Sequence, residues 1–192
     1  MEKGETPCRY HGLVENAYAR EERIRQAPES EVVEAIGADP RADPGLLPGL
    51  LSAYIDERDP GGVELVLTLL SRFDQYGPVI VPQMCRLLLA DWHTDHEDLA
   101  RDLQRFSDPR AVPALRQAAE IQLEYLSYND GQALHRKCMW ALSDIRTAEA
   151  VTALEELIRS PIEHVRELAA YHLAKVRNNE PRSPGSRNYV GP

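Results

Sequence analysis

Two histidines with nearby carboxylates are the residues best suited to metal chemistry. His93 and His96 stand three residues apart, and acidic side chains occupy most of the stretch 95–98. On a helix this spacing puts two imidazoles on neighbouring faces of one turn, but a zinc site needs three or four converging ligands. A capping box explains Thr94 and Glu97 more simply, beside a solvated acidic turn. We therefore expect no metal site.

The other candidates for chemistry are incomplete sets. Cys8 and His11 lie close together, but no second pair follows them at zinc-finger spacing. No serine or cysteine stands in a glycine-framed nucleophile elbow or another recognisable catalytic context. Gly61 and Gly62 fall at an expected helix start and not in a phosphate-binding loop. The sequence therefore predicts no catalytic residues, no cofactor, and a protein that is not an enzyme.

The charge balance favours a protein partner. The 192 residues include 31 Asp and Glu against 22 Lys and Arg, which gives a formal net charge of −9. Sequence-independent binding of nucleic acid needs an excess of cations, so we expect no nucleic-acid partner. An acidic surface suits a basic protein partner, although excess acid also serves solubility.

Apolar runs and cysteine usage predict a cytoplasmic protein. The longest apolar runs, such as 79–81 and 87–90, are far too short to span a bilayer, so we expect no membrane partner. The first residues do not resemble a signal peptide. Three widely spaced cysteines fit reduced thiols better than a disulfide framework, and Cys85 and Cys138 fall in apolar helical patterns.

The elements that must position these residues are helices. Apolar residues recur at steps of three and four, and no stretch shows sustained strand alternation. The pattern predicts helices at residues 13–26, 29–37, 44–57, 60–73, 77–90, 95–106, 109–126, 131–145, 148–159 and 161–177.

Capping residues mark several helix starts. Ser160-Pro161-Ile162-Glu163 combines a cap hydroxyl, a proline at the first helical position and a returning carboxylate. Asp59-Pro60 and Asp108-Pro109 each give an acidic cap followed by proline. Residues 178–192 are rich in Pro, Gly, Ser and Asn and predict a flexible tail.

An internal repeat organises the helices. Aligning Leu103 with Leu142 also brings Phe106 onto Ile145, at an offset of 39 residues (142 less 103). A partial copy follows at an offset of 31 (173 less 142), with Leu173 in the place of Leu142, and a weaker copy lies upstream. Periods of this size predict a stacked solenoid. The predicted core contains Leu99, Leu103, Phe106, Leu142, Ile145, Leu154, Leu173 and Val176.

One repeated phrase carries a family resemblance. The string Asp108-Pro109-Arg110-Ala111-Val112-Pro113-Ala114-Leu115, placed between two helices, resembles the HEAT repeat in its short bacterial form. The resemblance covers residues 95–177 well and 44–93 loosely. It implies an all-α fold, a right-handed α-solenoid of HEAT-like helical hairpins over 44–177. An N-terminal helical extension (1–43) would precede it, and the flexible tail (178–192) would follow it.

Three further strings resemble a group of bacterial HEAT-like proteins, namely Trp92 to Ala100, Tyr125 to Asp130, and Arg136 to Leu142. Proteins of that group often look like immunity proteins, which neutralise the toxin of a polymorphic or contact-dependent system. The resemblance implies a protein-binding module, an immunity protein that covers a basic toxin domain. Two alternatives stay open: a general scaffold or adaptor, and a lyase-like enzyme of the kind that attaches bilins to phycobiliproteins.

The repeat register places one set of side chains on the expected concave face. Arg101, Trp140 and Tyr171 each lie two residues before a core leucine, roughly 200° around the helix from it. Residues one turn earlier and later complete a grid with the composition of a protein interface. We expect Trp140 to be buried between helices and Tyr171 and the charged members to be exposed. The predicted partner-binding members of the grid are Glu97, Arg101, Arg136, Trp140, Asp144, Glu167 and Tyr171.

The insertion at residues 121–131 is a second candidate surface. It interrupts an otherwise regular repeat, and extra loops on regular scaffolds are common places for recognition. Its candidate contacts are Tyr125, Tyr128 and Asp130. Alternatively, both tyrosines pack against the end of a lengthened helix.

Overall fold

The structure, a computed structural model, describes residues 24–182, except for the side chain of residue 129. All regular secondary structure in this range is helical. The α-helices are α2 (Glu29–Ile36), α3 (Leu46–Glu57), α4 (Pro60–Arg72), α5 (Val81–Leu88), α6 (His96–Phe106), α7 (Val112–Ala118), α8 (Gln132–Ile145), α9 (Ala148–Leu157) and α10 (Glu163–Arg177). Short 3₁₀ helices are η2 (Pro78–Ile80), η3 (Pro109–Ala111) and η4 (Glu124–Asn129). No described helix is long and apolar enough to cross a membrane.

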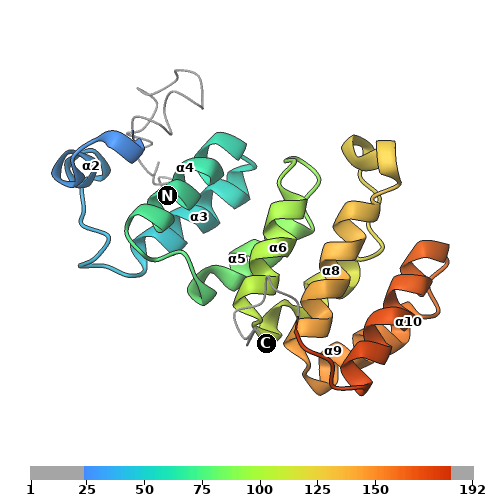
Figure 1. Cartoon of the computed structure of the whole chain (residues 1–192). Coiled ribbons are helices and arrows are strands. Elements are labelled where there is room, and N and C mark those ends of the chain that lie inside the picture. Colours follow the sequence, from blue (N-terminus) through green and yellow to red (C-terminus); the bar gives the residue numbers. More distant parts are fainter. Residues whose placement is uncertain (1–23, 183–192) are drawn as a thin grey trace, which may run out of the picture.

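The helices stack in two layers (Figure 1). In one layer α6 packs on α8 and α8 packs on α10, and in the other α3, α5, α7 and α9 follow one another. The contacts from α6 through α8 to α10 are the more extensive, as expected for the concave side of a curved stack. We call α4, α6, α8 and α10 the inner layer. The predicted all-α solenoid is confirmed.

The core lies between the two layers and follows the repeat register. Leu103, Leu142 and Leu173 are buried on successive inner helices, and Leu154 of α9 meets them from the outer layer. Leu99 and Ile145 are also buried, as predicted. Phe106 and Val176, in the last turns of α6 and α10, are only half-buried.

The predicted helix at 109–126 is wrong over its second half. Its first turn is η3, α7 ends at Ala118, and the backbone is extended at Leu123 before η4 begins. The carbonyl of Ile121 accepts a hydrogen bond from the His135 ring at 2.8 Å, and no amide one turn later takes that place. The tyrosines of the insertion therefore do not extend a long helix.

The predicted start of the last helix is two residues too early. α10 begins at Glu163, and the Ser160 hydroxyl accepts the Ile162 N–H at 3.2 Å before the helix begins. Asp108 does cap as predicted, because its carboxylate accepts the Arg110 N–H at 2.9 Å.

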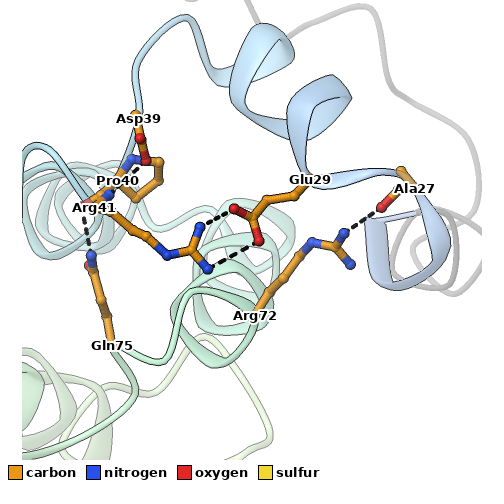
Figure 2. A network of polar contacts seen from close by, with 7 residues as sticks. All are labelled: Ala27, Glu29, Asp39, Pro40, Arg41, Arg72 and Gln75. Atoms are coloured by element: carbon orange, nitrogen blue, oxygen red, sulfur yellow. Dashed lines mark hydrogen bonds and ion pairs between the residues drawn. The ribbon is translucent and has the colours of Figure 1, made fainter.

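The described part of the N-terminal extension is fastened to the end of α4. Figure 2 shows Arg41 paired with Glu29 through the two terminal guanidinium nitrogens, Nη1 and Nη2. Arg72 and Gln75, at and after the end of α4, donate hydrogen bonds to backbone carbonyls of the segment 24–43. Most of the predicted first helix, 13–26, lies outside the described residues.

The first residues of the predicted tail are held against α8. Arg146 donates to the Asn179 side chain at 3.2 Å and to the Glu180 carbonyl. Arg182 Nε donates to the Asp144 carbonyl at 2.8 Å, near the end of α8. These hydrogen bonds order residues 178–182, while residues 183–192 lie outside the described range.

Candidate functional site

Three side chains at equivalent repeat positions form an exposed row across the inner layer. Arg101 lies on α6, Trp140 on α8 and Tyr171 on α10. Trp140 is 37% exposed and Tyr171 59% exposed, and both rank among the exposed large apolar side chains of the described chain. The prediction that Trp140 is buried is wrong, because no helix of the described chain covers the outward side of α8. We call these three residues the inner row.

The charges around the inner row are nearly balanced. Glu97 of α6 forms a 2.7 Å ion pair with Lys137 of α8, which links the two helices. Arg101 pairs with Asp98 at 3.1 Å, and Lys175 Nζ lies 5.7 Å from the centre of the Tyr171 ring. Among the described residues, the side chains of Arg136 and Glu167 make no hydrogen bond or ion pair. Both are exposed and available to a partner.

Asp144 is not part of this surface. It is 1% exposed, and its carboxylate accepts a hydrogen bond from Gln104 Nε2 of α6 at 2.7 Å. The prediction of an exposed, partner-binding Asp144 is therefore wrong. The side chain of Asp144 therefore serves the contact between α6 and α8.

The insertion is pinned at one tyrosine and exposed at the other. The Tyr125 hydroxyl lies 2.9 Å from His96 Nδ1, and burial raises the pKa of Tyr125 to about 12. Tyr128 is 76% exposed, and Asp130 is exposed with a left-handed backbone (φ 52°) that ends η4. Of the predicted contacts, Tyr128 and Asp130 are thus accessible, while Tyr125 holds the insertion to α6.

The predicted acidic turn around His93 and His96 is not solvated at the histidines. Both rings are buried and stack with centroids 4.3 Å apart. Their Nε2 atoms donate to carbonyls at and just after the end of α5, at 2.7 Å to Leu87 and 2.6 Å to Ala90. The capping box also fails: the Asp95 N–H goes to His93 Nδ1 at 3.1 Å, and no side chain caps α6. These histidines close a helix junction.

A second buried histidine occupies the same repeat position. His135 follows His96 by 39 residues (135 less 96), the offset of the repeat. Its Nε2 donates to the Ile121 carbonyl at 2.8 Å, and its Nδ1 lies 2.8 Å from His164 Nε2 of α10. Burial lowers the pKa of both His96 and His135 below the ordinary value, which favours neutral rings. Sequence reasoning missed this role, although the register aligns the two residues.

A groove runs between α4 and α6 on the inner layer. Unlike α6 and α8, these two helices are not closely packed, and the space between them has a volume of about 860 Å³. Leu67 contributes apolar surface to it, while Glu64, Asp98 and Arg105 contribute charge. Arg101 is the member of the inner row that also lines this groove. No sequence pattern predicted it, because it arises from the spacing of two helices.

The described residues offer little for catalysis or metal binding. No group of three or more His, Cys, Asp or Glu side chains among them is placed to hold a metal ion. Burial raises the pKa of the Cys85 thiol to about 11 and that of Cys138 further, so neither is a thiolate at neutral pH. The buried histidines are engaged with backbone carbonyls and other rings.

The comparison with known proteins agrees with the repeat. Residues 134–160, which cover nearly all of α8, all of α9 and the start of the next link, match the family model described as PBS lyase HEAT-like repeat. The chain therefore contains a HEAT-like repeat in its second half. No curated protein and no solved structure matches the chain.

Proposed function

We propose that this protein binds a partner protein with its inner layer, around Trp140 and Tyr171. The observation that carries the proposal is the exposure of two large aromatic side chains on neighbouring helices at equivalent repeat positions. Trp, Tyr and Arg dominate the energetics of protein interfaces because they bury much surface and still offer a polar group. A HEAT-like repeat presents such side chains at regular spacing on its concave side.

The charged residues beside the row support directional recognition. Arg136 lies one helical turn before Trp140, and Glu167 one turn before Tyr171, so each aromatic has an exposed charge next to it. Neither charge has a partner among the described residues. Charges of this kind steer the approach of a partner protein and fix its orientation, while the aromatic side chains provide the buried contact.

Within this class we propose an immunity protein that neutralises a bacterial toxin. The support is the resemblance of the strings at 92–100, 125–130 and 136–142, together with the net charge of −9. Exposed carboxylates at Asp95, Asp130 and Glu163 lie at or just before the starts of α6, α8 and α10. In this proposal the inner layer covers the basic cleft of the toxin, and substrate is excluded sterically.

Isolation of the partner tests the proposal. The chain is purified from its native host with its bound partner, and the activity of the partner is measured with and without the chain. We expect a toxin whose activity is inhibited in a one-to-one complex, and weaker inhibition by Trp140→Ala or Tyr171→Ala. Val79→Ala is the matched control, because Val79 is an exposed apolar residue of η2 outside the inner row. A partner with no toxic activity would instead support the general adaptor.

The lyase-like use of the fold is a second candidate, since the matching family model is named after a lyase. It predicts that the chain binds a bilin and transfers it to a phycobiliprotein. Absorbance of the chain mixed with bilin and acceptor distinguishes the two functions, because a binding module produces no covalent adduct on the acceptor.

A further inference from the structure

The inner helices α8 and α10 lie side by side and run in the same direction. Near the start of α8, His135 Nδ1 lies 2.8 Å from His164 Nε2 of α10. Near the end of α8, the Ser143 hydroxyl lies 3.0 Å from His172 Nδ1. Both contacts join residues 29 positions apart (164 less 135, and 172 less 143). The two helices are therefore parallel and keep one register along their length.

Two matching pairs of exposed side chains stand on these helices. On α8 they are Arg136 and Trp140. On α10 they are Glu167 and Tyr171, which follow the first pair by 31 residues (167 less 136, and 171 less 140). This offset exceeds the contact register by two residues (31 less 29), so corresponding side chains are level to within about 3 Å. Because each aromatic residue lies about 200° around its helix from a buried core leucine, both pairs face away from the outer layer.

The chemical pattern of this surface is complementary to itself. A two-fold axis that runs between α8 and α10, parallel to both, would set α8 of one copy against α10 of a second copy at the same levels. Arg136 then meets Glu167 of the second copy, and Trp140 meets Tyr171 of the second copy. Because the symmetry repeats each contact, the basic side chain of each copy faces an acidic one and every aromatic side chain faces another.

The surface that such a contact buries is small. α8 has 14 residues and α10 has 15, so each is roughly 20 Å long, and two packed helices are about 20 Å wide. Two faces of this size bury about 800 Å² in total, which is below the range of about 1,200–2,000 Å² for stable interfaces. The net charge of −9 on each copy also opposes association. The contact is therefore weak and exchanges readily.

We propose that a second copy of this chain covers Trp140 and Tyr171 when the partner protein is absent. The charges favour this occupant, because neither Arg136 nor Glu167 has a partner within the described chain and a two-fold pair satisfies both. The inference rests on the proposed function, since the partner protein and the second copy use one surface. The two therefore compete, and only the monomer binds the partner.

Charge reversal tests the symmetry of the contact. Arg136→Glu sets carboxylates against each other at both symmetric contacts, and Glu167→Arg does the same with guanidinium groups. Each variant alone should dimerise at least about tenfold more weakly than the parent chain. An equal mixture of the two variants should recover the parent's dimerisation, because in the mixed dimer every carboxylate meets a guanidinium group.

Analytical ultracentrifugation of the full chain measures these differences. The parent chain should show a dissociation constant of about 10–300 µM, as expected for an interface of this size. Glu34→Arg on α2 makes the same charge change as Glu167→Arg at an exposed residue outside the contact and should dimerise like the parent chain. Circular dichroism checks that each variant keeps the helical fold.

A parent chain that stays monomeric at about 1 mM, single variants that dimerise as strongly as the parent, or a mixture that stays monomeric would each overturn the proposal. The partner protein separates this inference from the proposed function. If the parent is monomeric and Tyr171→Ala loses partner binding, the inner row is the partner site and the second copy is rejected. If the mixture restores the dimer and Tyr171→Ala binds the partner normally, the second copy stands and the inner row is not the partner site.

Discussion

Nδ1 of His135 lies 2.8 Å from Nε2 of His164, and the two rings stack with centroids 5.1 Å apart. Because His135 donates its Nε2–H to the Ile121 carbonyl, its Nδ1 carries the lone pair and accepts the His164 N–H. A proton added at His135 Nδ1 would place two N–H groups against each other. The junction of α8 with α10 therefore favours a neutral His135.

The residue at the repeat position of His135 has the same structural role in three repeat units. His96, one repeat earlier, donates to the Ala90 carbonyl at 2.6 Å. Arg166, 31 residues after His135 (166 less 135), donates to the Ser160 carbonyl at 2.8 Å. A first-turn donor thus satisfies a carbonyl of the preceding link in each unit. The burial of His96 and His135 is explained by these helix junctions.

The buried histidines should make the fold acid-sensitive. Burial, and second the charge of Lys175, lower the pKa of His172 to about 4, and burial lowers the pKa of His96 and His135 as well. The unfolded chain then binds more protons, so stability is full above about pH 6.5 and is lost as the pH falls toward about 4. His172 alone should lower the free energy of unfolding by about 2 kcal/mol between about pH 7 and about pH 5. Urea unfolding at the two pH values measures it.

His172→Gln is the variant that isolates this contribution. Gln keeps a side chain able to meet the Ser143 hydroxyl, which lies 3.0 Å from His172 Nδ1, but does not titrate. The variant should lose less free energy of unfolding on acidification than the parent chain. A parallel loss in both proteins would show that His172 is not responsible.

Removing one hydroxyl should loosen the insertion. In Tyr125→Phe the buried Nδ1 of His96 loses its partner at 2.9 Å, which should cost about 1 kcal/mol of stability. Amides at 124–131 should exchange faster with solvent, because this hydrogen bond ties η4 to α6. Tyr128→Phe is the control, since its side chain is exposed, and unchanged exchange in both variants would contradict the pinning role of Tyr125.

Periodicity predicted the helices and the core because both depend on spacing along the chain. Leu103, Leu142 and Leu173 share one environment, and the register alone places them there. Periodicity did not predict that α7 ends at Ala118, because apolar residues continue through Ile121 and Leu123. The turn after α7 is explained by the hydrogen bond from His135 to the Ile121 carbonyl. A contact between residues 14 positions apart leaves no local pattern.

The repeat register also predicted part of the candidate site. The register placed Tyr171 on an exposed face, but it treated Asp144 as equivalent to the exposed Arg105. Asp144 is instead turned toward Gln104 of the neighbouring helix, which depends on how closely α6 and α8 pack. The α4–α6 groove, in contrast, exists because these two inner helices do not pack closely. Helix spacing of this kind cannot be derived from a single sequence.

Truncation of a core leucine should be costly. Leu142 is fully buried on α8 between the two layers, so Leu142→Ala leaves a cavity and should lower the free energy of unfolding by roughly 2–5 kcal/mol. Val79→Ala, at an exposed site, should change it by less than about 0.5 kcal/mol. Chemical denaturation followed by circular dichroism measures both, and a neutral effect at Leu142 would contradict the repeat register.

The inner row should show its role in binding kinetics. Tyr171→Ala should chiefly raise the dissociation rate, by up to about 30-fold, because a well-exposed aromatic anchor contributes about 2 kcal/mol once it is buried by a partner. Glu167→Lys should chiefly slow association and change its salt dependence, because a long-range charge acts before contact. Surface plasmon resonance with the purified partner, at two ionic strengths, separates the two rates.

Trp140 needs a separate measurement, because only 37% of its side chain is exposed and its truncation can also affect the packing of the helices. A fall in the melting temperature of Trp140→Ala would report packing, whereas faster dissociation at unchanged melting temperature would report the interface. Variants of Arg101, Arg136 and Tyr171 should keep the melting temperature of the parent chain. If these variants bind normally while Tyr128→Ala or Asp130→Ala abolishes binding, recognition belongs to the insertion and the inner row is not the interface.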